Sequence, residues 1–110
     1  PEASLAVSRM LTTAFEESPA GRANKAAQGP WSIAAKTGTA QMSKENGGGY
    51  YDDRVLHSVL GYFPAYEPRF VVLVYFVNPK GERYSSATAA YTFADVSHYL
   101  LTYYQVAPDR

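Results

Sequence analysis

The residues best able to do chemistry are Lys36, Thr37, Gly38 and Thr39, which follow the short, mostly apolar run Trp31–Ala35. Lysine offers a positive charge to an anionic group, and threonine hydroxyls donate hydrogen bonds to a carboxylate. Glycine has no Cβ, so a ligand can approach the backbone closely. At the edge of a sheet, such a strand can accept an extended peptide as one more strand, and a backbone N–H can help to hold an oxyanion. The pattern predicts a site for a peptide that ends in a carboxylate and is attacked at a nearby carbonyl.

Helices and strands must position this site, and the hydrophobic pattern predicts their order. We expect helices over 2–18 and about 86–105, strands at about 31–39, 55–63 and 69–77, and a polar loop over 19–30. The run 70–77 is apolar on both faces, which is typical of a strand inside a sheet that is covered on both sides. The order predicts an α+β fold, in which an antiparallel sheet carries the N- and C-terminal helices on one face.

Composition excludes several function classes. The 110 residues allow one domain, and ten basic and ten acidic side chains cancel, which argues against binding nucleic acid through net charge. The absence of cysteine excludes disulfides, thiolate metal sites and cysteine nucleophiles. His57 and His98 have no partners at ligand spacing, and Asp52 and Asp53 follow three glycines in a polar segment, so we predict no metal site and no cofactor.

The Lys-Thr-Gly string is part of the signature of penicillin-binding proteins and serine β-lactamases. The segments "NKAAQGPWSIAAKTGTAQM", "GGGYYDDRVLHSVLGYFPAYEPRFVVLVYFVNPKG" and "ATAAYTFADVSHYLLTYYQVAPD" resemble the third strand, the fourth and fifth strands and the last helix of the transpeptidase domain of class B penicillin-binding proteins. Septal, cell-division members are the most similar. Thr92 stands where the family commonly has proline, which should affect the helix start and not the chemistry. The resemblance implies that residues 1–110 are the C-terminal portion of such a domain, with part of its serine β-lactamase-like fold.

The resemblance also implies a role for each residue of the motif. Lys36 matches the lysine that sets the positive potential of the site, and Thr37 and Thr39 match the hydroxyl residues that hold the terminal D-alanine carboxylate or that of a β-lactam. The backbone N–H of Thr39 matches one of two oxyanion-hole donors, Gly38 keeps the strand approachable, and Gln41 matches the glutamine that often follows the motif. In the family a serine attacks the D-Ala–D-Ala stem peptide, releases D-alanine and passes the acyl group to an amine on a neighbouring strand.

The implied setting is the periplasmic or extracytoplasmic face of the cytoplasmic membrane, with an anchoring N-terminal segment that this chain lacks. The implied partners are stem peptides, β-lactams and cell-wall synthesis proteins. We expect the edge of strand 69–77 to be covered by the remainder of the domain or by a second copy, because an exposed apolar edge associates or aggregates.

The nucleophile is missing from this sequence. No serine has lysine three positions later, and there is no S-x-N triplet; the resemblance implies that both motifs lie upstream of Lys36. The chain alone is therefore predicted to be inactive, because it cannot form the covalent intermediate. Two alternatives stay open, a non-catalytic penicillin-recognising sensor domain and a fragment of a serine β-lactamase, and the upstream sequence would distinguish them.

Overall fold

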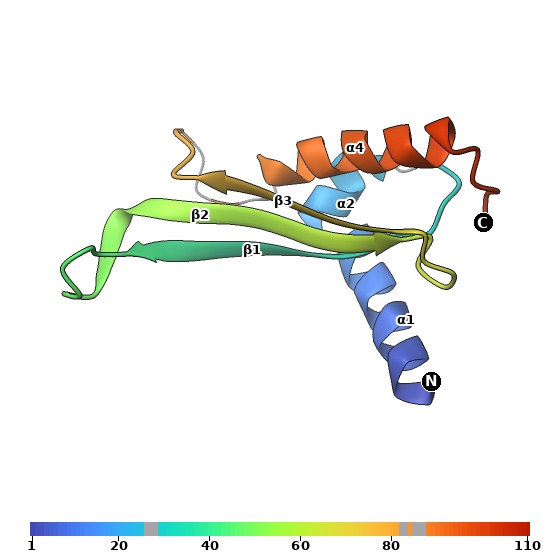
Figure 1. Ribbon diagram of the computed structural model, residues 1–110, viewed down its shortest axis with the longest axis horizontal. Coiled ribbons are helices and arrows are strands. Elements are labelled where there is room, and N and C mark those ends of the chain that lie inside the picture. Colours follow the sequence, from blue (N-terminus) through green and yellow to red (C-terminus); the bar gives the residue numbers. More distant parts are fainter. Residues whose placement is uncertain (26–28, 82–83, 85–87) are drawn as a thin grey trace.

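A three-stranded antiparallel sheet forms the frame of the molecule (Figure 1). The computed structural model describes residues 1–25, 29–81, 84 and 88–110. The strands are β1 (Ala34–Ser43), β2 (Tyr50–Phe63) and β3 (Phe70–Val77), in the spatial order β1-β2-β3. The helices are α1 (Glu2–Glu17), α2 (Pro19–Ala23) and α4 (Ala89–Tyr103). These elements are those of an α+β fold, as the sequence predicted.

The hairpin of β1 and β2 is longer than the sequence predicted. β1 runs to Ser43 and not to residue 39, and β2 begins at Tyr50 and not at residue 55. The turn between them is short, since the N–H of Lys44 donates to the carbonyl of Gly49 at 2.8 Å and the N–H of Gly47 donates to the carbonyl of Lys44 at 3.1 Å. The Lys36–Thr39 motif consequently lies inside a strand and not at its end.

The start of the chain also differs from prediction, because a second short helix occupies part of the expected loop. Ser18 is extended, with φ −70° and ψ 161°, and its Oγ accepts a hydrogen bond from the N–H of Gly21 at 3.1 Å. Ser18 therefore ends α1 and caps α2, in which Pro19 occupies the first turn. Residues 26–28 of the predicted loop and 86–87 of the predicted last helix lie outside the described residues.

The hydrophobic core lies between the sheet and α4. Alternate residues of β2 are buried on this face: Val55, His57, Val59, Gly61 and Phe63. Alternate residues of β3 are half-buried and pack on the same core: Phe70, Val72, Val74 and Phe76. Phe93 of α4 is fully buried at its centre, with its ring 6.0 Å from that of Phe63 and 5.9 Å from that of Phe15, both edge-on. The packing of these rings holds α4 against β2 and joins it to the end of α1.

The two terminal helices share one face of the sheet only where α1 ends. Phe15, in the last turn of α1, meets Phe93 of α4. Ser8, two turns earlier, contacts the hydroxyl of Tyr62 through its own hydroxyl at 2.7 Å. Side chains alternate along β2, and Phe63 points toward α4, so its neighbour Tyr62 points away from α4. The start of α1 thus lies on the opposite side of the sheet (Figure 1). The apolar pattern predicted the helix, but the buried residues of α1 are Ser8, Thr12 and Phe15, while Leu5, Val7 and Met10 are 43–62% exposed.

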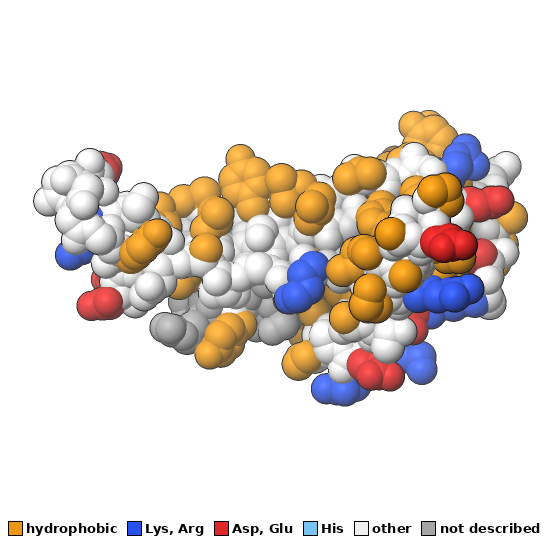
Figure 2. Space-filling model, turned by 90° about the horizontal axis from the view of Figure 1, so that it is seen from below, with side chains coloured by type: hydrophobic (Ala, Val, Ile, Leu, Met, Phe, Trp, Pro, Cys, Tyr) orange, Lys and Arg blue, Asp and Glu red, His pale blue; other side chains and the backbone are white. Residues whose placement is uncertain are grey.

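The face of the sheet opposite α4 is apolar and exposed. Five side chains on it are 54–74% exposed and form what we call the far face: Leu60, Val71, Leu73, Tyr75 and Val77. Figure 2 views the molecule from this side, where hydrophobic side chains gather along it. Within the described residues, β3 is hydrogen-bonded to a strand on one side only. The strand predicted to lie inside a doubly covered sheet is therefore at an edge in this chain.

Candidate functional site

The Lys36–Thr39 motif lies on the outermost strand at one side of the sheet. In β1, Lys36 is opposite Leu60 of β2, and Thr39 is opposite His57. In the part of the chain that the structure describes, β1 is paired with β2 only, so its other edge faces outward. Lys36 and Thr39 are exposed, and Thr37 and Gly38 are partly exposed. The edge is thus accessible to an extended peptide, which is the geometry that strand addition requires.

The side chains of the motif are divided between the two faces of the sheet. Thr37 and Thr39 lie opposite Val59 and His57, so they are on the face that α4 covers, and Gln41 follows on the same face. Lys36 lies on the other face, opposite Leu60. A group that contacts both the threonine hydroxyls and the lysine ammonium must therefore lie along the edge itself.

The Lys36 ammonium bends back toward its own strand. Its Nζ donates to the carbonyl of Thr37 at 3.0 Å. An ammonium group has three N–H donors, so this bond leaves others for an anionic ligand. The charge is consequently held within reach of the edge that Thr37 and Thr39 share.

Gly38 lies opposite Ser58, on the same face as Lys36. A Cβ at Gly38 would be 2.8 Å from the Ser58 hydroxyl oxygen, which is closer than real Cβ contacts. A side chain here would push the Ser58 hydroxyl aside and would stand next to the Lys36 side chain. Glycine at this position therefore leaves the Ser58 hydroxyl in place and adds no side chain to this part of the edge.

A buried histidine lies beneath the motif. His57, opposite Thr39, is fully buried, and its Nδ1 is 2.6 Å from Oγ1 of Thr88, the residue before α4. This bond joins the strand behind the site to the start of α4, so His57 connects two elements of the fold. Thr88 was not singled out from the sequence, although threonine directly before a helix is a common capping residue and could have drawn attention.

The other candidates from the sequence lie apart from the motif. Asp52 and Asp53 are exposed on β2, and the ring of His98 packs edge-on against Trp31 at 5.9 Å. No group of three or more His, Asp or Glu side chains among the described residues could hold a metal ion. No helix in the same part of the chain is long and apolar enough to cross a membrane.

The described residues form a rim and not an enclosed pocket. A hollow of about 50 Å³ lies between the end of α1 and β1, lined in part by Phe15, Lys36 and Thr37. Ligand pockets usually measure roughly 300–1,000 Å³, so this hollow is too small for a peptide. The larger hollows of about 500 and 640 Å³ are not lined by the motif. A substrate held at Lys36–Thr39 would need a second wall.

Comparison with known proteins gives one consistent family. The family model of the penicillin binding protein transpeptidase domain matches residues 1–98. The chain is 33% identical over 92 residues to the peptidoglycan D,D-transpeptidase FtsI of Buchnera aphidicola subsp. Baizongia pistaciae. It is 34% identical over 79 residues to that of Buchnera aphidicola subsp. Schizaphis graminum. The matches cover 83% and 71% of this chain but only 16% and 14% of these relatives.

Solved structures agree with the sequence match. Penicillin binding protein 3 from Mycobacterium tuberculosis, complexed with ampicillin, is 28% identical with a TM-score of 0.73, over 94% of this chain and 25% of that chain. The transpeptidase domain of penicillin-binding protein 3 from Burkholderia pseudomallei is 28% identical with a TM-score of 0.71, over 94% of this chain and 30% of that chain. The fold and the family predicted from the sequence are confirmed. The chain therefore belongs to the penicillin-binding protein transpeptidase domain family, of the class B type that its sequence resembles.

Proposed function

We propose that this chain supplies one wall of the active site of a serine D,D-transpeptidase, which cross-links peptidoglycan stem peptides and is acylated by β-lactams. The observation that carries the proposal is the accessible edge of β1, where a Lys-Thr-Gly-Thr motif offers hydroxyls on one face and a lysine on the other. Two relatives are named peptidoglycan D,D-transpeptidase, which supports peptidoglycan as the substrate class. Both of these relatives are named FtsI, which is also the name of the septal enzymes that the sequence resembles. We therefore propose that the parent enzyme is of the septal, cell-division type.

In the proposed reaction the stem peptide lies along β1 as an added strand. The hydroxyls of Thr37 and Thr39 donate to its terminal carboxylate from one face, and the Lys36 ammonium supplies positive potential from the other. Gln41, two residues beyond Thr39 on the same face, contacts the peptide further along. Gly38 lets the peptide backbone approach.

The chemistry is acyl transfer. A serine from a segment that precedes this chain attacks the carbonyl of the penultimate D-alanine, forming a C–O bond. The peptide C–N bond then breaks, and D-alanine leaves with the proton. An amine of a neighbouring stem peptide next displaces the serine. The backbone N–H of Thr39 is one of the donors that hold the tetrahedral oxyanion, and loss of one such donor typically costs about 10²–10³ in kcat.

β-Lactams are proposed to occupy the same rim. The Mycobacterium tuberculosis relative is described as complexed with ampicillin and, in a further structure, with aztreonam. By the same geometry, the carboxylate of a penicillin would accept hydrogen bonds from Thr37 and Thr39 here. The strained amide would be opened by the serine, leaving a stable ester.

The second wall and the nucleophile are proposed to come from the rest of the transpeptidase domain. We call the longer protein, in which that segment precedes this chain, the complete domain. The far face and the edge of β3 are apolar and exposed, so they are expected to be covered by the complete domain or by a second copy of the chain. Because peptidoglycan lies outside the cytoplasmic membrane, we propose a periplasmic or extracytoplasmic location, an N-terminal anchor and cell-wall synthesis proteins as partners.

The test is covalent labelling by fluorescent penicillin. The complete domain should carry the label through denaturing electrophoresis, and this chain alone should carry none. An unlabelled complete domain, or a labelled chain, would contradict the proposal.

Two other functions use the same motif, and the fate of the label separates them. A serine β-lactamase would release the label within seconds as a hydrolysed product. A penicillin sensor would retain it but would not exchange the terminal D-alanine of a stem-peptide analogue for another D-amino acid. A transpeptidase should retain the label and also perform this exchange.

A further inference from the structure

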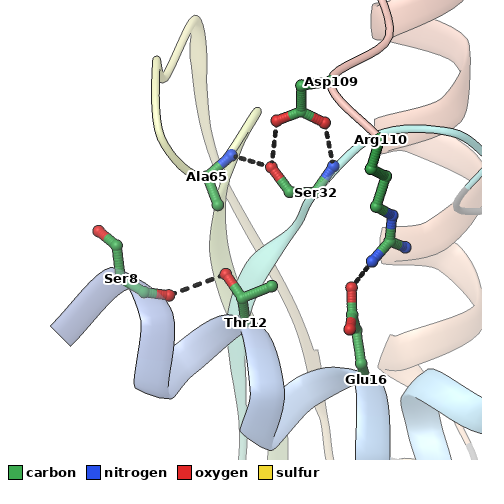
Figure 3. A network of polar contacts seen from close by, with 7 residues as sticks. All are labelled: Ser8, Thr12, Glu16, Ser32, Ala65, Asp109 and Arg110. Carbon is green, nitrogen blue, oxygen red and sulfur yellow. Dashed lines mark hydrogen bonds and ion pairs between the residues drawn. The ribbon is translucent and has the colours of Figure 1, made fainter. Parts of the chain in front are cut away.

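A carboxylate near the C-terminal end of the chain binds the residue that leads into β1. One oxygen of Asp109 accepts the N–H of Ser32 at 2.7 Å, and the other accepts the Ser32 hydroxyl. The Ser32 oxygen in turn accepts the N–H of Ala65 at 2.9 Å (Figure 3). The Asp109 carboxylate thus binds Ser32, which lies two residues before β1. Through the Ser32 hydroxyl it is also connected to Ala65, in the turn that follows β2.

The regular β1–β2 pairing begins at Ala34 and does not include Ser32. Continuing the register from Ala34 opposite Tyr62 puts Ser32 opposite Pro64, which has no N–H to donate. The carbonyl of Ser32 instead accepts the N–H of Ala65 at 3.0 Å, and the N–H of Ser32 goes to Asp109. Since Ser32 is buried, its N–H needs such a partner. Asp109 therefore serves as the terminal acceptor of the ladder.

Neighbouring bonds hold the same tail against the same segment. The indole N–H of Trp31 donates to the carbonyl of Val106 at 3.0 Å, and the backbone N–H of Asp109 donates to the carbonyl of Pro30 at 3.2 Å. Arg110 forms an ion pair with Glu16 of α1 (Figure 3). The two bonds to Val106 and Pro30 bring the Asp109 carboxylate to Ser32 from a position 77 residues later in the sequence.

The connection from Ser32 to the site is short and stiff. Ile33, Ala34 and Ala35 are at most 1% exposed, and Lys36 follows directly. A closely packed strand does not absorb a displacement at its start, so a shift at Ser32 is passed on to the motif. A slip of one residue would exchange the faces of Lys36 and Thr37.

We propose that Asp109 is a positioning residue for the substrate-binding edge of β1. The inference rests on the proposed function of that edge as a transpeptidase site. The Asp109 carboxylate does not reach the substrate. It fixes the start of β1, and thereby the alignment of the Thr37 and Thr39 hydroxyls and the Thr39 N–H with the attacked carbonyl.

The test is the Asp109→Asn variant of the complete domain. Asparagine keeps the size and one acceptor oxygen but turns an NH₂ group toward one of the two Ser32 donors. We expect the acylation rate constant for penicillin, measured per labelled molecule, to fall about tenfold, within the roughly hundredfold that a 1 Å misplacement can cause. Ser32→Ala removes the hydroxyl link to Ala65 and should slow acylation in the same way, and it serves if Asp109→Asn does not fold.

The control is Arg110→Ala, which breaks the adjacent ion pair with Glu16 but leaves the bonds to Ser32. Its acylation rate constant should equal that of the wild type. A purely structural role for Asp109 would lower the labelled fraction or the melting temperature while the rate constant of the labelled molecules stayed the same, and that result would overturn the inference. If the wild type itself took no label, the proposed function would fail and this inference with it.

Discussion

Gly61 of β2 lies opposite Ala35 of β1 and directly beneath the ring of Phe93. A Cβ added at Gly61 would be 2.5 Å from Cζ of Phe93 and 2.8 Å from Cβ of Ala35. Ala35, the residue before Lys36, therefore lies beside a position at which only the hydrogen atom of glycine fits beneath Phe93 of α4. This contact fixes how closely the motif strand lies to the core.

The first prediction follows from this contact. Gly61→Ala should lower the free energy of unfolding of the complete domain by roughly 1–3 kcal/mol, because it overpacks a fully packed region. The measurement is chemical denaturation. Gly48→Ala, in the exposed turn between β1 and β2, is the control and should change stability by no more than about 0.5 kcal/mol. Equal stability of Gly61→Ala and the wild type would mean that α4 does not pack here as described.

The second prediction concerns the bond beneath Thr39. Thr88→Val keeps the side-chain volume but removes the hydroxyl that lies 2.6 Å from Nδ1 of the buried His57. The free energy of unfolding should fall by about 1–3 kcal/mol, the usual cost when a buried polar atom loses its partner. Thermal and chemical melts of the complete domain provide the measurement. Thr92→Val, on the exposed side of α4, should be close to neutral, and a Thr88→Val melt that matches it would show that the bond contributes nothing.

The third prediction concerns the far face. Leu73, which is 57% exposed here, is expected to be buried in the complete domain. Leu73→Lys should therefore reduce self-association of this chain alone, measured by sedimentation. The same change should destabilise the complete domain by about 2–4 kcal/mol, since it loses leucine burial and buries an ammonium group.

The control for this pair of experiments is Thr102→Lys, on the exposed side of α4. It should leave both association and stability unchanged. If Leu73→Lys were tolerated in the complete domain as well as Thr102→Lys, the far face would be exposed there too.

The elements and the motif could be predicted from the sequence because they depend on local patterns. The three-and-four spacing in α1, the alternation in β2 and the Lys-Thr-Gly string each lie within a few residues. Strand ends were less predictable. Gln41 and Ser43 are polar, but an edge strand tolerates exposed polar side chains while its backbone pairs with β2. Composition therefore did not reveal that β1 continues past Thr39.

The contacts that support the site could not be predicted, because they join residues far apart in the chain. Asp109 and Ser32 are 77 residues apart, and His57 and Thr88 are 31 apart. Ser18-Pro19 shows a local ambiguity: a serine before a proline can end one helix or start another, and here it does both. The division of Lys36 and Thr37 between two faces became visible only once the register was known.

The most direct test of the central claim is the second-order rate constant for penicillin acylation of the complete domain carrying Lys36→Ala or Thr39→Val. Hydrogen bonds to charged groups contribute about 1.5–3 kcal/mol, so each variant should be slowed roughly tenfold to a hundredfold. Lys44→Ala, in the exposed turn, should react as fast as the wild type. If both motif variants reacted at the wild-type rate, the edge of β1 would not be where the carboxylate of the substrate is held.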